Sequence, residues 1–494
     1  MALNLFRTKS PEHLMAEAAA PERQLKRALS AFDLTCIGIG AIIGTGIFAL
    51  AGTAAAGEQA HAVGSIWKTP VLNFVQSWTT HASLVFGRPG AGPAVMLSFV
   101  VAGIACGFAA LCYAELAAMI PVSGSAYTYS YATLGEIIAW IIGWDLILEY
   151  AVGNMAVAVG WSGYFVRLCG SLFNLKFPLW LVNDHTTATG IIAQGGDALA
   201  NYSSTTLPTI AGHAIALNLP ALLIVAAVTA LLVYGIRESA RTNTTIVIIK
   251  IAVVMFVIAF GAFLVQPTNW RPFVPTGIGG VMSGAAIVFF AFIGFDAVST
   301  TAEETKNPQR DMPIGIMASL IICTVLYVLM AGVITGMRKY TTYLGDPAAV
   351  ATAFADRPWA TARFRTPHIT TIWTGVAVGG VAMLTDIGSL ADLTNIGTLF
   401  AFVLVCLGVI VLRRTNRERP RPFRVPFVPV FPLLGVVFCF ALMLSLPLET
   451  WGRFFIWLAI GLSIYFAYSV RHSKLRRGVD TGITEDIPPP LIKT

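Results

Sequence analysis

Eleven segments of the chain are long and apolar enough to cross a lipid bilayer, and more polar stretches separate them. The hydrocarbon core of a bilayer takes about 20 helical residues, and these segments lack the alternation of apolar and polar residues that marks a membrane barrel. The pattern therefore predicts an all-α polytopic membrane protein. The predicted spans are 34–55, 93–119, 136–168, 217–236, 243–265, 279–300, 314–336, 369–386, 391–413, 427–447 and 451–470.

Composition agrees with this fold class. Hydrophobic residues make up 56% of the chain and charged residues 12%, against about 25% charged residues in soluble domains. The seven cysteines lack metal-ligand spacing and are interpreted as small buried hydrophobic residues. The sequence contains no nucleophile–base spacing and no phosphate loop, so we expect no enzyme, no catalytic residues and no metal. The net charge of +7 is interpreted as basic cytoplasmic loops rather than nucleic-acid binding.

Three polar stretches are predicted to lie outside the bilayer core. Residues 1–30 are amphipathic and lack the apolar core of a signal peptide, so we expect a cytosolic segment against the membrane. The stretches 57–92 and 170–215 are too polar to span and too poor in apolar residues to form a core. They are predicted to be long outer loops.

Lysines and arginines in the short loops predict the orientation, because such loops face the cytoplasm. With the N-terminus inside, the basic loops 236–242 and 301–313 are cytoplasmic. After seven spans the chain is outside, and residues 337–368 contain no eighth long apolar run.

The count of eleven spans conflicts with the positive charges in the C-terminal part of the chain. If the span from 369 runs inward, the loop RRTNRERPRPFR (413–424) and the tail RHSKLRR (471–477) face outside. Twelve helices would satisfy every basic loop, whereas eleven violate the rule twice. We therefore expect that one inward-going helix is missing between Tyr340 and His368.

Four glycines interrupt the first span, in the stretch GIGAIIGTGIF (38–48). Glycine inside a helix costs about 1 kcal/mol relative to alanine, so the cluster needs an explanation. One explanation is close helix packing through the small-xxx-small pair Gly40 and Gly44. The other is a break at Gly44-Thr45-Gly46, which frees N–H groups and lets the following half-helix attract a carboxylate.

A second interrupted span favours the break. Residues 289–297 read FFAFIGFDA, with Gly294 and the acidic Asp296 well inside the sixth apolar run. Two broken spans five apart are typical of an inverted repeat of two five-helix halves. Phe290 precedes the second break and is a candidate gate over a ligand, although an aromatic residue in a Phe-rich helix also serves as packing.

Ionisable residues inside the spans are candidate functional groups. Lys250 in IVIIKIAVV costs roughly 2.5–3.5 kcal/mol at the centre of a membrane helix. One interpretation is that its side chain extends to the membrane surface. The other is that it faces the interior of the helix bundle and gains and loses a proton while the protein functions. Asp296 and Glu149 are its candidate partners, and Glu149 shares a helix face with Asp145. A purely structural salt bridge or hydrogen bond remains the alternative for both acids.

Four long motifs stand out in the sequence: GIGAIIGTGIF (38–48), CYAELAAMIPVSGSAYTYSYATLGE (112–136), FFAFIGFDAVSTTAEETKNPQRDMPIGI (289–316) and LADLTNIGTLFAF (390–402). Together they resemble the amino acid–polyamine–organocation superfamily, and within it the cationic amino acid transporter branch and its bacterial relatives. The resemblance covers about 30–337 and 369–470 and leaves out the two long outer loops. It implies a five-plus-five inverted repeat followed by two extra C-terminal helices. The eighth helix of that fold, which belongs to the second repeat, is not present here.

The resemblance also implies a site. The first break binds the carboxylate of the substrate and the sixth span its amino group. The implied substrate-binding residues are Ile42, Ile43, Gly44, Thr45 and Gly46 on the first span and Phe290, Ala291, Ile293 and Asp296 on the sixth, with Phe290 as the gate. Lys250 matches a fifth-helix lysine at a sodium-like position, which implies coupling by protons without another cofactor. Glu149, like Asp296, falls where relatives carry acids in the transport pathway.

The predicted function is secondary active transport of cationic or small neutral amino acids across the cell membrane, by proton symport and alternating access. The alternative is a transport-defective or sensor-like binding protein, because a scaffold helix is missing. Expected partners are an amino acid and the lipid bilayer, without nucleic acid, and a small accessory membrane subunit is left open. The predicted divisions are 1–30, the first repeat 31–265, the second repeat 266–413, two extra helices in 414–470 and a cytosolic tail 471–494.

Overall fold

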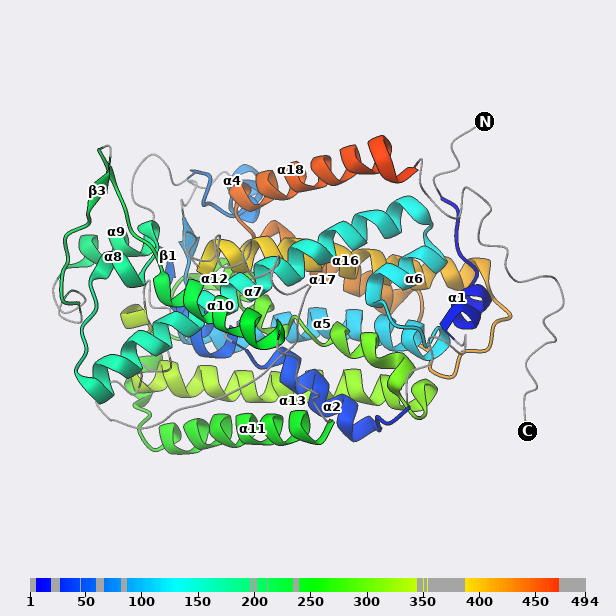
Figure 1. The fold of residues 1–494 in the computed structure, drawn as a ribbon, viewed down its shortest axis with the longest axis horizontal. Coiled ribbons are helices and arrows are strands. Elements are labelled where there is room, and N and C mark those ends of the chain that lie inside the picture. The colour runs from blue at the N-terminus through cyan, green and yellow to red at the C-terminus, as the bar shows by residue number, and fades with distance from the viewer. Residues whose placement is uncertain are drawn as a thin grey trace.

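The structure is a computed structural model, and it describes residues 6–18, 27–44, 46–58, 66–80, 87–195, 199, 202–210, 212–233, 240–343, 350, 353 and 387–470. Most of its long helices run side by side along one axis (Figure 1). These helices are α2 (Ala31–Ile42), α5 (Val95–Met119), α7 (Glu136–Phe173), α10 (Leu219–Val233), α11 (Ala240–Ala262), α12 (Gly277–Val288), α13 (Pro308–Met337), α16 (Ile387–Thr415), α17 (Val430–Leu444) and α18 (Leu448–Ile464).

Shorter elements lie at the ends of the bundle or continue its helices. The short α-helices are α1 (Pro11–Ala18), α3 (Ala51–Ala56), α4 (Val71–Thr80), α6 (Ser125–Thr133), α8 (Leu179–Val182) and α9 (His185–Gln194). The tighter or wider turns are η1 (Gly46–Leu50), η3 (Gly92–Ala94), η5 (Pro267–Trp270), η6 (Phe289–Phe292), η7 (Asp296–Glu304), η8 (Tyr340–Tyr343) and η9 (Tyr465–Ser469). Two antiparallel strand pairs join β1 (Gly57–Glu58) to β2 (Arg88–Pro89) and β3 (Thr209–Ile210) to β4 (His213–Ala214).

The all-helical membrane class predicted from the sequence is confirmed. Five segments among the described residues are long and apolar enough to cross a membrane, or six if the bent pair Ala31–Ile42 and Gly46–Ala56 is one span. The number of eleven spans and the inverted repeat stay predictions, and the predicted span 369–386 lies outside the described residues. The five segments are Gly92–Met119, Gly277–Glu304, Pro308–Met337, Leu390–Thr415 and Leu448–Ser469, and shorter apolar helices cover Leu219–Ala230, Val247–Ala262 and Val430–Leu444.

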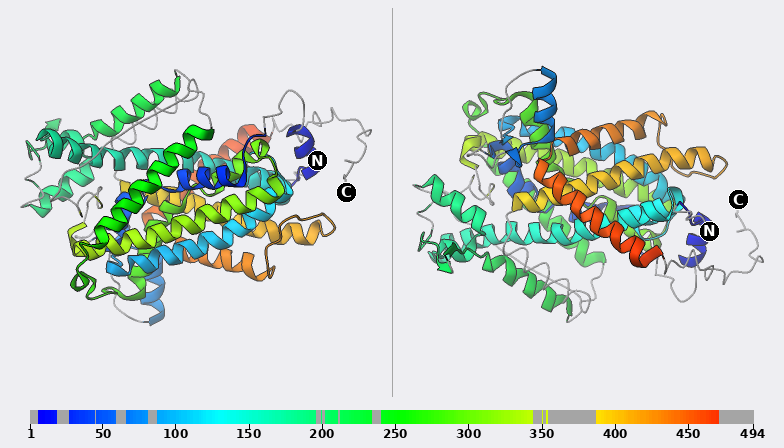
Figure 2. Two further views of the ribbon diagram at one scale, coloured as in Figure 1. Left: turned by 90° about the horizontal axis from the view of Figure 1, so that it is seen from below. Right: turned by 90° about the horizontal axis from the view of Figure 1, so that it is seen from above.

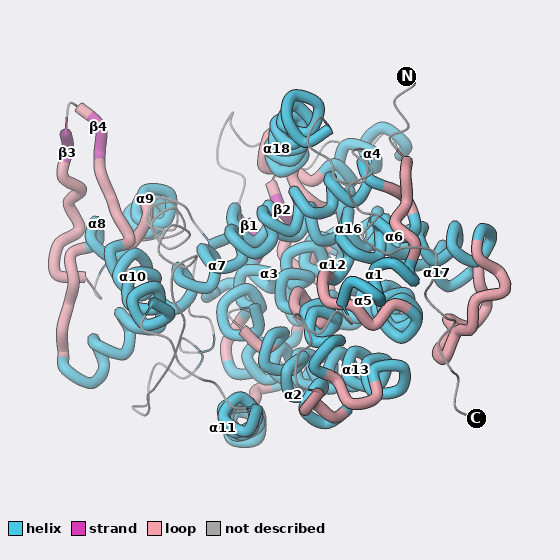
Figure 3. The backbone as a smooth tube through the Cα atoms, turned by 45° about the vertical axis from the view of Figure 1, so that its right-hand side comes forward, coloured by secondary structure: helices cyan, strands magenta, loops and turns pink. Residues whose placement is uncertain are grey.

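The predicted outer loop 170–215 contains a little more order than the sequence indicates. The helices α8 and α9 and the pair β3–β4 project beside α10 at the edge of the bundle (Figure 3). Leu179, Ala188 and Ala216 are buried together there. This cluster is too small for a domain core, and it fixes the two short helices to the end of α10.

One end of the bundle gathers the N-terminal segment and several later loops, and we call it the inner end. The backbone N–H of Leu29 donates to the carbonyl of Glu304 at 3.0 Å, and Glu12 in α1 forms an ion pair with Arg419. The dark-blue helix α1 lies on this side in both views (Figure 2). The loop 413–424, with its six arginines, therefore lies on the same side as the N-terminal segment.

The opposite end, called the outer end, joins the loops before α5 to the start of α16. Arg88 and Asp392 form a buried ion pair at 2.6 Å. The hydroxyl of Thr276 donates to the carbonyl of Gly90 at 2.6 Å, and the amide of Asn269 donates to the carbonyl of Gly336 at 2.8 Å. Because α13 ends and α16 begins at this outer end, the loop after α16 returns to the inner end.

This arrangement bears on the side of the loop 413–424, which the count of eleven spans left open. The loop 413–424 faces the side of the N-terminal segment, as its charges require, rather than the opposite side. The basic tail 471–477 lies outside the described residues, as do most of the residues between Tyr340 and His368 where a helix is expected to be missing.

Candidate functional site

The first span is broken where the glycine pattern predicts. α2 ends at Ile42, and Ile43 takes an extended backbone conformation with φ −74° and ψ 97°. The helix resumes as the wide turn η1 at Gly46, and the two halves are bent by 46°. Thr45, at the centre of the predicted carboxylate site, lies outside the described residues.

Packing explains other glycines of the same stretch. A Cβ added at Gly38 would lie 2.6 Å from the Cβ of Ser319 in α13, closer than real side-chain carbons approach. A Cβ at Gly40 would lie 2.8 Å from a methyl group of Val247, whereas one at Gly44 would meet nothing within 4 Å. Of the small-xxx-small pair, therefore, only Gly40 packs against a neighbouring helix, and Gly44 belongs to the break. Gly38, which that pair does not include, packs against α13.

The sixth predicted span is also interrupted. α12 ends at Val288 and the tighter turn η6 follows, after which Ile293 is extended with φ −59° and ψ 132°. Gly294 has φ +117°, a conformation that side chains with a Cβ rarely adopt, and η7 then starts at Asp296. The α-helical conformation of the sixth span is thus interrupted around Gly294, the residue that the sequence singles out.

The two breaks touch each other. A Cβ at Gly46 would lie 2.5 Å from the Cα of Ala291, so the backbones of η1 and η6 are in direct contact. The sequence predicts that the breaks hold opposite ends of one ligand, and at this point the structure brings them together without space for it. Phe290 beside the contact is 8% exposed and belongs to the core, so its gate role stays a prediction.

Lys250 on α11 reaches the first break. Its Nζ donates to the carbonyl of Gly40 at 2.9 Å and to the carbonyl of Ile43 at 2.8 Å. Of the two interpretations of this lysine, the structure favours the bundle-facing one. An ammonium group there stabilises the carbonyls at the end of α2, where the helix dipole is negative.

The acids do not pair with this lysine. Asp296, Glu149 and Asp145 are each at most 3% exposed, and none forms a salt bridge with Lys250 among the described residues. The hydroxyl of Ser125 donates to Oδ2 of Asp296 at 3.3 Å. Both oxygens of Asp145, one of Glu149 and one of Asp296 have no hydrogen-bond partner within the described part of the chain. The two acids, which the sequence offered as candidate partners of Lys250, are therefore not its partners in this conformation.

Tyr327 on α13 joins the two breaks and was missed by the sequence analysis. Its hydroxyl lies 2.8 Å from the carbonyl oxygen of Ile42 and 2.7 Å from that of Ala291. The available signal was a tyrosine within the apolar run LIICTVLYVLMAG, because a buried phenol needs a hydrogen-bond partner. The sequence offers no means of locating that partner on two distant spans.

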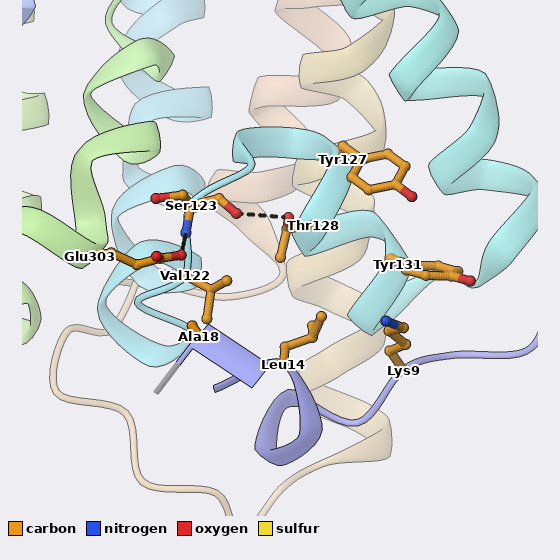
Figure 4. Close-up of a pocket in the computed structure, with 9 residues that line it drawn as sticks. All are labelled: Lys9, Leu14, Ala18, Val122, Ser123, Tyr127, Thr128, Tyr131 and Glu303. Carbon is orange, nitrogen blue, oxygen red and sulfur yellow. Dashed lines mark hydrogen bonds between the residues drawn. The ribbon is translucent and has the colours of Figure 1, made fainter. Parts of the chain in front are cut away.

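A cavity of about 270 Å³ lies elsewhere, at the inner end between α1 and α6 (Figure 4). The backbone N–H of Ser123 donates to Glu303 at 2.9 Å on one wall, and Lys9 and Tyr131 form another. A second cavity, of about 320 Å³, is lined by residues of α7 between Gly143 and Asn154. Neither cavity contacts the breaks, so neither is the predicted substrate site.

Two interrupted spans that pack against each other, with a lysine of α11 bonded to the first break, are typical of secondary transporters. Comparison with known proteins gives the same class. The family model described as amino acid permease matches residues 29–364, and a model of the C-terminus of such permeases matches 423–473. The chain belongs to the amino acid permease family.

Several characterised relatives are similar over most of this chain. The branched-chain amino acid permease BcaP of Bacillus subtilis is 42% identical, with 96% of this chain and 99% of that permease covered. The methylthioribose transporter of the same organism is 40% identical over 96% of this chain and 100% of that transporter. The vacuolar cationic amino acid transporter 4 of Arabidopsis thaliana is 32% identical over 79% of this chain and 64% of its own length.

The comparisons confirm the resemblance inferred from the four motifs. The chain is a multi-pass protein of the cell membrane in a transport family, and its relatives support an amino acid as the transported class. Membership in a transporter family agrees with the expectation that the chain is not an enzyme. The alignment to the Bacillus permease is 519 residues long although this chain has 494, so that relative contains residues without a counterpart here.

Proposed function

We propose that the protein imports amino acids by proton symport, with alternating access around the two breaks. The observation that carries this proposal is the contact of the Lys250 ammonium with the carbonyls of Gly40 and Ile43. The resemblance implies that this is the position of a coupling sodium ion in other transporters. A lysine provides a positive charge there that a proton can create and remove.

The coupling follows from the strength of these hydrogen bonds. A charged donor binds a carbonyl about twice as strongly as a neutral one. Protonated Lys250 therefore holds α11 to the end of α2 firmly, and loss of the proton weakens that link and lets the first break move. Proton release on the cytoplasmic side then favours release of substrate on the same side.

The substrate is proposed to bind between the breaks when they separate. Its carboxylate accepts from N–H groups around Thr45 and Gly46, with Ile42, Ile43 and Gly44 alongside. Its ammonium donates to carbonyls around Phe290, Ala291 and Ile293. Asp296 and Glu149 are buried without a basic partner within the described part of the chain, which supports a role for them in handling positive charge along the pathway.

The divisions of the chain are part of this proposal. Residues 31–265 form the first repeat and 266–413 the second, and 414–470 add two extra helices. The positions of the breaks in the first and sixth spans support this division, because an inverted repeat places its interrupted helices at corresponding positions. Residues 1–30 and 471–494 are assigned to the cytosol.

Transport into liposomes that contain the purified protein tests the function. We expect accumulation of at least one of radiolabelled L-leucine, L-alanine and L-lysine when an inward proton gradient is imposed, and loss of accumulation without it. Lys250→Met is expected to abolish gradient-driven accumulation and to keep exchange of internal for external substrate. Accumulation by this variant at the wild-type level would remove the coupling role, and Lys306→Met, at an exposed position of the inner end, is the matched control.

A second candidate function is a binding protein that no longer cycles. It is favoured by the residues of the Bacillus relative that have no counterpart here and by the lack of a long apolar run in 337–368. A scaffold that lacks one helix could keep the site and lose alternating access. Binding of an amino acid without any exchange across the liposome membrane would support this candidate and exclude the first.

A further inference from the structure

The outer end contains a buried ion pair that the proposed transport cycle does not yet use. Nη1 of Arg88 lies 2.6 Å from Oδ2 of Asp392, and the two residues are 3% and 5% exposed. Charged side chains are rarely buried so completely, because burial removes them from water. Apolar side chains in place of such a pair often leave a protein equally stable, so stability alone is a weak reason for a pair here.

Arg88 is attached to the outer halves of both interrupted spans. It lies in β2, which pairs with β1 directly after α3, and the backbone N–H of Ala91 donates to the carbonyl of Ala54 in α3 at 2.9 Å. The carbonyl of Gly90 accepts from the hydroxyl of Thr276, immediately before α12, at 2.6 Å. Backbone contacts therefore move Arg88 together with α3 and the start of α12.

Asp392 belongs to α16, which reaches the second break from the outer end. On this helix Asp392 lies ten residues before Phe402, or about 15 Å along the axis. The ring of Phe402 lies 5.8 Å from the ring of Phe289 and 5.0 Å from that of Phe295, centroid to centroid, and these two residues stand on either side of the break. α16 therefore extends from the ion pair to the proposed substrate site.

A neutral contact accompanies the ion pair. The amide of Asn395, about one turn after Asp392 on α16, donates to the carbonyl of Ala286 in α12 at 2.8 Å. Asn395 is fully buried. One charged and one neutral contact thus join α16 to the outer halves of the spans, on the outer side of the breaks.

We propose that Arg88 and Asp392 are positioning residues that form the outer gate of the carrier. The ion pair closes the outer side, and it separates when the outer halves of the two spans move away from α16. Paired charges suit the dry closed state, and water stabilises the separated charges in the open state. The inference rests on the proposed function, since a gate presupposes alternating access, and it goes further by assigning the outer gate to two residues.

Two changes of the pair have opposite consequences. Asp392→Asn leaves the charge of Arg88 buried without the carboxylate charge of Asp392, so the closed state is destabilised and the outer-open state, in which water reaches Arg88, is favoured. Arg88→Met together with Asp392→Leu removes both charges and leaves apolar side chains that avoid water. This double variant therefore favours the closed state.

The accessibility of a buried position on α12 measures the state of the gate. Ser283 is 2% exposed and lies about one turn before Ala286, whose carbonyl contacts α16. Ser283→Cys replaces one oxygen by sulfur, and a small membrane-impermeant thiol reagent is applied to intact cells, with the chain without the added cysteine as background.

We expect labelling of Ser283→Cys to become about fivefold faster or more with Asp392→Asn and about fivefold slower or more with the double variant. A purely structural ion pair would leave the rate unchanged. Equal rates in the three backgrounds, or a shift in the same direction with both changes of the pair, would overturn the proposal.

Glu449→Gln is the matched control. Glu449 and Arg453 form a partly exposed ion pair at the same end of the bundle, but both residues belong to α18. Because this pair lies within one helix, its loss should not change the labelling of Ser283→Cys. A change equal to that produced by Asp392→Asn would contradict the proposal.

If Asp392→Asn does not fold, the double variant decides, because it leaves neither of the two charges buried. Labelling of Ser283→Cys at or above the wild-type rate in this variant would reject the gate.

Binding and uptake of L-leucine, L-alanine and L-lysine separate failure of the gate from failure of the proposed function. The apparent affinity for external amino acid should rise with Asp392→Asn and fall with the double variant, because affinity follows the fraction of carriers that are open to the outside. Unchanged affinity with both would count against the gate. A wild-type protein that neither binds nor moves any of the three amino acids would instead reject the proposed function, and the labelling rates would still decide whether the ion pair controls opening.

Discussion

Gly294 shows how one residue sets the geometry of the second break. Its φ of +117° is unfavourable for residues with a Cβ, and an added Cβ would lie 2.9 Å from the carbonyl carbon of Ala41 in α2. The backbone around Gly294 therefore needs glycine for its conformation and for its contact. At this residue the break and the packing of the two spans depend on each other.

Gly294→Ala is expected to reduce both stability and transport. Strain at such a backbone position costs on the order of 1–3 kcal/mol, and the contact with Ala41 adds to it. Thermal unfolding of the detergent-solubilised protein and exchange of L-leucine in liposomes measure the two effects. Gly107→Ala, in the middle of α5 where an added Cβ meets nothing within 4 Å, is the control and should be neutral or slightly stabilising. Equal behaviour of both variants would contradict this account of Gly294.

The sequence marks candidate residues of the site, but it does not indicate their contacts. The glycines at 44, 46 and 294 are detectable because glycine is costly inside a helix, and Lys250 because charge is costly in lipid. The partners of Lys250 were assigned to acids, since side-chain charges are visible in a sequence. Backbone carbonyls freed by a break carry no such mark, and the same reason hid the role of Tyr327.

At the scale of elements, Glu115 joins the end of α5 to the loop after α16. Its carboxylate accepts from Arg413 at 2.6 and 2.9 Å and from the backbone N–H of Val425 at 2.7 Å, and Arg421 lies 3.3 Å away. Glu115 is 1% exposed, so its charge is compensated almost entirely by these groups. The contact fixes the arginine-rich loop 413–424 to the inner end of the bundle.

Glu115→Gln should lower the unfolding temperature. Hydrogen bonds to a charged group are worth about 1.5–3 kcal/mol, and the variant weakens several of them and leaves the guanidinium groups less compensated. The measurement is thermal unfolding in detergent, beside Glu418→Gln as an exposed control in the same loop. We expect a clear decrease for Glu115→Gln and none for the control. An unchanged unfolding temperature would show that this contact contributes little to the inner end.

The sequence predicts helices correctly where a single property, the length of an apolar run, decides the structure. The apolar runs at 93–119, 314–336 and 391–413 correspond to α5, α13 and α16, because length and apolarity alone decide a membrane helix. The order in 170–215 was not predictable, since α8 and α9 pack on residues far along the loop. Pairwise packing of this kind depends on the fold and leaves no periodic pattern.

At the scale of the whole molecule, the path of the chain is constrained most strongly by the side of the membrane on which each loop lies. The ion pair of Glu12 with Arg419 brings the loop 413–424 to the N-terminal segment, and the ion pair of Arg88 with Asp392 brings the start of α16 to the other end. The charge rule applied to the sequence required this placement and could not be satisfied with eleven spans. The contacts at both ends agree with the charge rule, and the number of spans stays a prediction.

Cysteine labelling tests this placement in the cell membrane. All seven native cysteines are buried, so a membrane-impermeant maleimide should react mainly with an added, exposed cysteine. Asn416→Cys in the loop after α16 and Thr79→Cys in α4 are both at exposed positions, at the inner and outer ends. We expect Thr79→Cys to be labelled in intact cells and Asn416→Cys only in inside-out vesicles. Labelling of both from the same side would contradict the two-ended arrangement, and reversed labelling would place the N-terminal segment outside. With the expected result, the chain leaves α13 and enters α16 on the same, outer side of the membrane. The stretch between these two helices must then cross the membrane an even number of times, so the single predicted span 369–386 cannot be its only crossing.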